Sequence, residues 1–217
     1  MINAIEQAIV DNPYVLRDGM SPEQVRAAAK AWLLEQLEDA SPSAPLSGAG
    51  GLSRMDDETT LAAIAGMQMY HEQTGDKAVQ QVMTALAQEM QNLGNPLVFT
   101  AIKDGAGEYV PLTAVQALTG RRYVWNKNAS LGVLARGSDY YGFTVYSDRV
   151  LRDRDGEKTE KMSGSAKYQI GIYIPVEYAQ QAFGAFANYL PGTSVGYICD
   201  EAIMEQAQEF FSWLMEA

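Results

Sequence analysis

Two stretches of the chain carry the same pattern: Tyr109 to Gly120 (YVPLTAVQALTG) and Tyr173 to Gly184 (YIPVEYAQQAFG). Each begins with an aromatic, a β-branched residue, a proline and an aliphatic residue, continues at helical spacing and ends on glycine. The copies have the same length and lie 64 residues apart. Such a repeat limits the chain to folds in which one small unit is built twice.

Each copy predicts a strand that ends at a proline and is followed by a short helix. Pro111 and Pro175 cannot donate the next hydrogen bond of a strand, but their fixed φ suits the first turn of a helix. Gly120 and Gly184 stand where a helix is closed by a left-handed residue. Two such units, separated by further strands, predict an antiparallel sheet packed on its own short helices.

The repeat resembles the copper amine oxidase N-terminal-like domain, a stalk module of surface proteins in Gram-positive bacteria. The resemblance covers about residues 96–198, where the usual family form is roughly YVPLRAVAEALG. The matching positions are Tyr109, Val110, Pro111, Leu112, Gly120, Trp125 and Asn126, and then Tyr173, Ile174, Pro175, Val176, Phe183 and Gly184. The resemblance implies a structural or binding module.

The chain also departs from the family pattern. Thr113 replaces a frequent Arg, Leu118 and Thr119 precede the first glycine where Ala and Leu are usual, and no Trp follows Gly184. The catalytic domain of a copper amine oxidase binds its metal through three histidines, whereas this chain has only His71. The resemblance therefore implies neither copper nor amine oxidation, and we expect no cofactor and no metal.

The periodicities predict an α+β chain in four parts. Residues 1–40 are expected to form N-terminal helices, and residues 41–54, which are rich in Pro, Gly and Ser, a flexible linker. Residues 55–94 are expected to form a helical hairpin. Residues 95–217 are expected to form the stalk-like domain, a mainly antiparallel sheet packed on short helices, with a helix at its C-terminus.

Alternating patterns place the strands of this last domain. They are expected at Leu97–Ile102, Arg122–Trp125, Leu131–Arg136, Tyr140–Tyr146 and Tyr168–Ile174. The charged segment Asp148–Lys161 predicts a solvated hairpin with a tight turn at Asp155 and Gly156.

The chain is acidic, with 16 basic and 27 acidic residues and a formal charge of −11. Residues 1–94 hold 5 basic and 13 acidic residues (net −8), and residues 95–217 hold 11 and 14 (net −3). We expect no direct binding to nucleic acid, because phosphate binding needs clustered Lys and Arg. The charge leaves open a chain that docks on a basic partner protein.

The sequence gives two expectations for the compartment. The first ten residues carry no Lys or Arg before their apolar run, and no stretch reaches the roughly 18 apolar residues that span a bilayer. As written, the chain is therefore expected in the cytoplasm without a membrane span, whereas the stalk resemblance implies the cell surface if a signal has been removed. The single Cys199 excludes an internal disulfide and a Cys-rich zinc site.

No catalytic set of residues is predicted. His71 is the only imidazole, and Cys199 could serve it as a nucleophile only through an unforeseen contact in the fold. The 27 acidic residues always allow some carboxylate pair, but their spacing singles out none. A calcium loop around Gly156 is not favoured, because the ligand positions do not fit the spacing. We expect a chain that is not an enzyme.

Two groups of residues are candidates for binding. Ten of the twelve tyrosines lie after residue 94, and such density can form a stacking surface, although half-buried aromatics on strands are more usual. The candidates on the strands are Tyr123, Trp125, Tyr140 and Tyr141. The candidates on the last helix are Trp213 and the acidic stripe Glu201, Glu205 and Glu209. The stripe suits protein docking but is more often only a solvated face.

Two functional hypotheses follow, and the oligomeric state stays open in both. The first is a non-catalytic stalk-like module that presents a tyrosine-rich surface to a protein or a cell-wall polymer, and it is motivated by the repeat. The second is an intracellular acidic protein, of a phage or a mobile element, that binds and blocks a host protein. It is motivated by the charge of residues 1–94 and by the acidic last helix.

Overall fold

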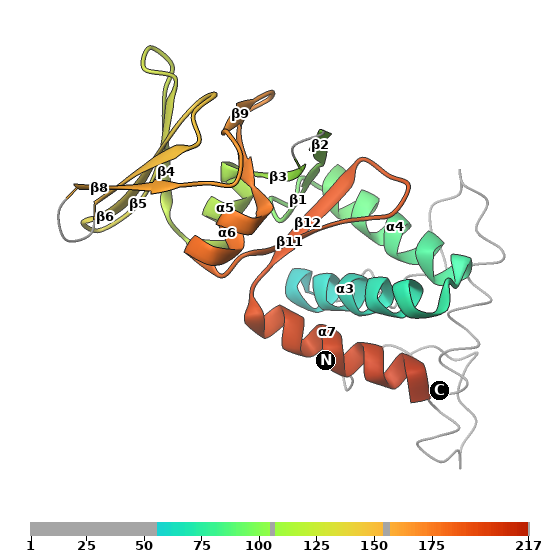
Figure 1. Ribbon diagram of the computed structural model, residues 1–217. Helices are drawn as coiled ribbons and strands as arrows, with labels where there is room; N and C mark the ends of the chain where they lie inside the picture. Colours follow the sequence, from blue (N-terminus) through green and yellow to red (C-terminus); the bar gives the residue numbers. More distant parts are fainter. Residues whose placement is uncertain (1–55, 105–106, 154–156, 217) are drawn as a thin grey trace. The chain divides into compact units, whose positions relative to one another are not determined.

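The structure is a computed structural model, and it describes residues 56–104, 107–153 and 157–216 (Figure 1). The chain is α+β, as the sequence predicts, with helices, mainly antiparallel sheets and a helix at the C-terminus. The predicted helices of residues 1–40 and the predicted linker 41–54 lie outside the described residues.

The chain divides into two compact units. One unit, called the helical unit, is made of Met1–Gln88 and Ala202–Ala217, and the other, called the α/β unit, of Glu89–Glu201. The last helix, which was predicted to follow the sheet within residues 95–217, groups with the helical unit in this division. The reason is a contact between residues far apart in the sequence, which local patterns do not reveal.

The helical unit contains α3 (Asp57–Thr74), most of α4 (Lys77–Asn92) and most of α7 (Glu201–Glu216). Asp56 caps α3 by accepting a hydrogen bond of 2.9 Å from the Thr59 N–H, and this bond lowers the pKa of the Asp56 carboxyl. Gly75 closes α3 at φ 72°, and the chain turns directly into α4. The hairpin follows the predicted pattern of helix, short turn and helix.

α3 is the central helix of this unit. All residues from Thr59 to Gln68 are buried, which is typical of a helix covered on every side. Small residues allow its neighbours to come close. A Cβ added at Gly66 would lie only 2.7 Å from the Ala207 carbonyl oxygen and 2.8 Å from Phe210, so α7 packs directly on the backbone of α3 here.

The α/β unit contains three sheets in which all neighbouring strands run antiparallel. The first has the order β1 (Val98–Thr100), β12 (Val195–Cys199) and β11 (Phe186–Tyr189). The second has the order β2 (Ile102–Asp104), β3 (Gly107–Pro111), β10 (Ile172–Pro175) and β9 (Lys167–Tyr168). The third has the order β4 (Arg122–Asn126), β5 (Leu131–Arg136), β6 (Asp139–Thr144), β7 (Arg149–Asp153) and β8 (Glu157–Lys161).

Two predicted strands are each divided in the structure. The strand expected at Leu97–Ile102 becomes β1 and β2, because the chain pairs with β12 as far as Thr100 and with β3 from Ile102 onward. Between them, the Ala101 N–H still donates to the Ser194 carbonyl at 2.7 Å. The strand expected at Tyr168–Ile174 becomes β9 and β10. Alternation marks extended backbone but does not show where a chain changes its partner strand. The Asp155–Gly156 turn lies outside the described residues, while β7 and β8 pair as the predicted hairpin.

Both copies of the repeat fold as predicted. β3 leads through Pro111 into α5 (Leu112–Thr119), and β10 leads through Pro175 into α6 (Val176–Phe183). Gly120 and Gly184 both close their helices at φ 64°. The proline, the helix and the left-handed glycine thus recur at the same positions of each copy.

The two copies are joined by the pairing of β3 with β10. Val110 lies opposite Ile174, which is its own equivalent in the second copy. Tyr109 lies opposite Pro175, and Pro111 lies opposite Tyr173. This register relates the copies by a local two-fold axis that passes between Val110 and Ile174, so the repeat builds a symmetrical centre for the unit.

The hydrophobic core of the α/β unit surrounds this centre. It brings residues of both repeats together with the inner side of the five-stranded sheet, as Figure 1 shows for α5 and α6. Among its buried members are Val110, Leu112, Val115, Leu134, Phe143, Ile174 and Ala179.

Candidate functional site

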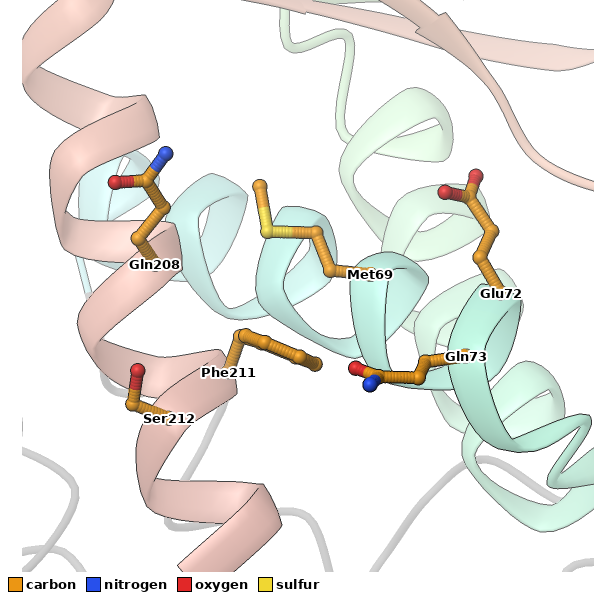
Figure 2. A pocket seen from close by; sticks show the side chains of 6 residues that line it. All are labelled: Met69, Glu72, Gln73, Gln208, Phe211 and Ser212. Atoms are coloured by element: carbon orange, nitrogen blue, oxygen red, sulfur yellow. The ribbon is translucent and has the colours of Figure 1, made fainter.

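A shallow groove runs between α3 and α7 on the helical unit. It is lined by Met69, Glu72 and Gln73 of α3 and by Gln208, Phe211 and Ser212 of α7, and its volume is about 660 Å³. Figure 2 shows the side chains of Met69, Gln73 and Phe211 extending into the space between the two helices, while Glu72 points away from Phe211. The floor of the groove is therefore apolar, and amide groups lie at its rim.

In addition to its buried face, α7 carries apolar residues that stay partly exposed, and one of them, Phe211, lines the groove. Its buried face holds Ile203, Ala207, Phe210, Trp213 and Leu214. A second stripe, defined here as Met204, Gln208, Phe211 and Met215, follows the helical spacing of four, three and four residues. Met204 and Phe211 are half-buried, and Met215 is 45% exposed, so this stripe stays in reach of solvent.

An acidic stripe lies beside the apolar stripe on α7. Glu201, Glu205 and Glu209 recur every four residues, and all three are exposed. The chain has no Lys or Arg after Lys167, so α7 has no basic residue of its own to balance them. A negative field therefore flanks the groove, and it favours a positively charged partner.

Trp213 was predicted to bind, but the structure places it in the interior. It is only 5% exposed and stacks on Phe210 with ring centroids 5.4 Å apart. Because the helix turns this residue to the buried face, it is Phe211, and not Trp213, that lines the groove. The sequence signal for Phe211 was available, since it stands one helical turn from both Gln208 and Met215.

The four candidates on the strands separate into two environments. Tyr123, Trp125 and Tyr140 are half-buried, whereas Tyr141 is 2% exposed and is not available to a ligand. Burial, joined by the nearby Asp139, raises the pKa of Tyr141. Tyr141 lies opposite Leu134 and on the same face of the sheet as Phe143, and both of these residues are buried.

Tyr141 lies at the centre of a cluster of charged residues that the sequence did not predict. Arg121 and Arg152 approach its ring, with the guanidinium carbons 5.1 and 4.8 Å from the centroid. Arg121 pairs with Asp139 at 2.8 Å, and Arg152 pairs with Glu160 at 2.6 Å. These pairs tie β6, β7 and β8 together on the inner face of the sheet.

The same cluster reaches the second repeat. The Tyr178 hydroxyl of α6 donates to Glu160 at 2.7 Å. Burial raises the pKa of Glu160, but the hydrogen bonds from Tyr178 and Arg152 outweigh it and lower the pKa below its usual value. The paired charges hold α6 on the sheet, which is a structural role.

An aromatic edge lies where β4 meets β9, and we define it as Tyr123, Trp125 and Tyr168. Trp125 stacks on Tyr168 with ring centroids 5.5 Å apart and an angle of 19° between the rings. Tyr168 is 49% exposed. Burial, followed by the neighbouring Tyr168, raises the pKa of Tyr123. One ring face of this edge is therefore open to a flat ligand.

His71 lies in a helix turn, and Cys199 lies in the interior of the α/β unit. His71 Nδ1 lies 2.8 Å from the Asp76 carbonyl oxygen in the turn between α3 and α4. Cys199 is fully buried at the end of β12, and burial raises the pKa of its thiol to about 12. At neutral pH this thiol is therefore protonated.

Comparisons of the chain with protein-family models, with curated proteins and with solved structures find no match. Within the described ranges, no cluster of three or more His, Cys, Asp or Glu side chains could hold a metal ion. None of the helices in that part of the chain is long and apolar enough to cross a bilayer. The resemblance to the stalk module stays a prediction.

Proposed function

We propose that the chain is a non-catalytic protein-binding module, and that the groove between α3 and α7 takes a basic amphipathic helix of a partner protein. The single observation that carries this proposal is the pair of stripes on α7. One stripe is mainly apolar and partly exposed, with Gln208 as its one polar member, and the other is acidic and exposed. A helix with an apolar face and neighbouring Lys or Arg residues is complementary to both at once.

The chemistry of the groove supports a helical partner. Met69 and Phe211 offer flexible and polarisable contacts, which suit the irregular surface of a partner helix. The groove runs between two helices, and helix-in-groove binding uses anchor residues spaced by three and four positions. This proposal is closest to the hypothesis of an acidic protein that binds and blocks a host protein.

The tyrosines support a tyrosine-rich binding surface less well. In the α/β unit, Tyr109, Tyr141, Tyr173, Tyr178, Tyr189 and Tyr197 are buried. Several of them pack in the core, for example Tyr178 against Phe143 with ring centroids 6.0 Å apart. The density of tyrosine in the sequence therefore largely reflects packing.

The test uses the full chain and two peptides of about 18 residues, since a partner helix of this length would fill the groove. One peptide has Leu at helical spacing and Lys elsewhere, and the other has the same Leu positions and Glu elsewhere. We expect the Lys peptide alone to bind, with an affinity that falls as salt is added. Isothermal titration calorimetry measures both affinities.

Variants locate the binding. Phe211→Asp is expected to weaken binding at least about tenfold, because it places a charge on the apolar floor. Glu205→Gln with Glu209→Gln should weaken binding and reduce its salt dependence, whereas Glu58→Gln with Glu89→Gln, an equal change of charge at exposed residues outside the groove, should not. Equal binding of the two peptides, or an unchanged affinity of a folded Phe211→Asp variant, contradicts the proposal.

The aromatic edge supports a second candidate function, the binding of a cell-wall polymer by a stalk-like module. The observation in its favour is the half-exposed Tyr168 stacked on Trp125, since sugar rings stack on such surfaces. Co-sedimentation with purified Gram-positive cell walls tests it. Tyr168→Ala should abolish sedimentation and Phe211→Asp should leave it intact. No sedimentation of the unaltered chain would exclude this candidate.

The two candidates also differ in compartment. A partner protein inside the cell requires the chain in the cytoplasm, whereas a cell-wall polymer requires it at the surface. Cell fractionation combined with mass spectrometry of the N-terminus separates these cases. A chain in the soluble fraction that starts at Met1 supports the first candidate, and a processed chain in the envelope supports the second.

A further inference from the structure

The five-stranded sheet has two faces, which the register of its strands identifies. Residues directly opposite each other on neighbouring strands share a face. Leu134, Tyr141 and Phe143 are buried and mark the inner face. Figure 1 shows α5 and α6 on one side of this sheet only. The residues that alternate with the buried ones form the outer face.

An apolar row crosses the outer face. Val124, Val133, Gly142, Leu151 and Thr159 lie opposite one another across the five strands. Val124 on the edge strand β4 is 46% exposed, and Leu151 on β7 is 38% exposed. Val124, Val133 and Leu151 therefore present apolar surface to another molecule on either side of the buried Gly142.

The centre of this row is the buried Gly142. A Cβ added at Gly142 would lie 3.4 Å from Leu131 and 3.5 Å from the Cβ of Leu151, so the glycine leaves a shallow depression between two leucines. Glycine weakens a central strand, and it often marks a place where another surface approaches closely. The outer face is thus shaped for a flat partner.

The charges on β7 indicate which partner fits. Arg149, Leu151 and Asp153 alternate along this strand and share the outer face, with the basic residue at one end and the acidic residue at the other. A two-fold axis along the apolar row would place Leu151 of one copy over Leu151 of another. The same axis would place Arg149 of each copy opposite Asp153 of the other. The face is therefore complementary to itself.

We infer that the outer face of the β4–β8 sheet binds the same face of a second copy of the chain. The two sheets pack face to face, as in a β-sandwich, with the apolar rows in contact and the Arg149 and Asp153 pairs at the two ends. This inference is independent of the helical groove and goes beyond the proposed function. A dimer of this kind carries two grooves and can bind two partner helices.

The size of the face sets the strength of the association. Five strands of about five residues cover on the order of 20 by 17 Å. This is smaller than the roughly 800 Å² per partner of a typical stable interface. The dimer is therefore weak, and we expect it to form at micromolar to submillimolar concentration.

Sedimentation velocity of the full chain, over a range of concentrations that ends near the solubility limit, tests the inference. The unaltered chain should change from monomer to dimer across this range. Leu151→Glu should raise the dissociation constant at least tenfold, whereas Ile170→Glu, an equal change at a residue 81% exposed outside this sheet, should not. A chain that stays monomeric throughout, or a folded Leu151→Glu variant that still associates normally, overturns the inference.

Charge exchange tests the geometry of the pair. Arg149→Asp alone and Asp153→Arg alone place like charges opposite each other, so each variant should stay monomeric. An equimolar mixture of the two variants places opposite charges at both ends and should associate at least as well as the unaltered chain. If the folded variants fail to associate when mixed, the two-fold arrangement is wrong.

Discussion

The two copies of the repeat share one backbone but have different interiors. In both, a strand leads through proline into an eight-residue helix that ends on a glycine at φ 64°. At the equivalent positions 114 and 178, however, the first copy has Ala114 and the second has Tyr178, and both side chains are buried. The proline and the glycine determine the backbone of each copy. The size of the buried side chains between them depends on the elements that each helix packs against.

The neighbours of the two helices explain the difference. Leu112 of α5 packs at Gly132 of the five-stranded sheet, where an added Cβ would lie 3.2 Å from its Cδ1 atom. Tyr178 of α6 reaches further across the same sheet and donates to Glu160. α5 therefore packs on the sheet through Leu112 at a glycine, and α6 is held through the longer, polar side chain of Tyr178.

The largest difference in stability between the copies is expected at the aliphatic residue that follows each proline. Leu112 is fully buried and Val176 is half-buried. We expect Leu112→Ala to lower the free energy of unfolding by about 2–5 kcal/mol, because it leaves a cavity under α5. Val176→Ala should cost only about 1 kcal/mol. Urea denaturation followed by circular dichroism measures both, and equal losses would show that the copies are packed alike.

The next effect concerns Tyr178, which has no polar equivalent in the first copy. Tyr178→Phe removes the hydrogen bond to Glu160 and should lower the free energy of unfolding by about 1–2 kcal/mol at pH 7. The folded pKa of Glu160 is lowered, so the stability from its carboxylate is present above about pH 4.5 and is lost as pH falls through the folded pKa. The difference between the unaltered chain and the variant should therefore shrink toward pH 3.

Tyr146→Phe is the control for this pH dependence, since Tyr146 is 79% exposed. It should change the free energy of unfolding by less than about 0.5 kcal/mol at every pH. A destabilisation by Tyr178→Phe that stays the same as the pH falls through the folded pKa of Glu160 would mean that the charge of Glu160 does not contribute.

The sequence predicted the fold best where local rules apply. The prolines and the left-handed glycines act through their immediate neighbours, and both repeats were predicted from them. The division of the strands at Ala101 and the packing of α7 on α3 were missed. Both depend on contacts between distant residues, such as Ala101 with Ser194 and Gly66 with Ala207.

The candidate site was only partly predictable for the same reason. Helical spacing alone placed Glu201, Glu205 and Glu209 on one exposed stripe. It did not show that the buried face of α7 extends to Trp213, which leaves Phe211 beside Met69 in the groove. The position of Tyr141 between two arginines also required the register of three strands.

Substitution of the glycine that ends each repeat helix should have nearly the same effect on stability in both copies. A Cβ at Gly120 or Gly184 would meet no atom within 4 Å, so only the left-handed backbone opposes a side chain there. We expect Gly120→Ala and Gly184→Ala each to cost about 1 kcal/mol, and the two values to agree within error. Thermal and urea unfolding measure both. Gly171→Ala, where no atom lies within 4 Å and φ is not left-handed, should cost less.

The smallest difference in stability is expected between the tyrosines at the first position of the two copies, Tyr109 and Tyr173. Both are 1% exposed, but the Tyr173 hydroxyl donates to the Thr100 carbonyl at 3.3 Å, whereas the Tyr109 hydroxyl has no hydrogen-bond partner among the described residues. Tyr173→Phe should lower the free energy of unfolding by about 0.5–1.5 kcal/mol, because it removes this hydrogen bond. Tyr109→Phe should leave stability unchanged or raise it, because it removes a buried polar group that has no partner. Urea denaturation of the two variants measures the difference. An equal loss in both would mean that the Tyr109 hydroxyl is hydrogen-bonded in solution, and the two copies would then be more alike than the structure shows.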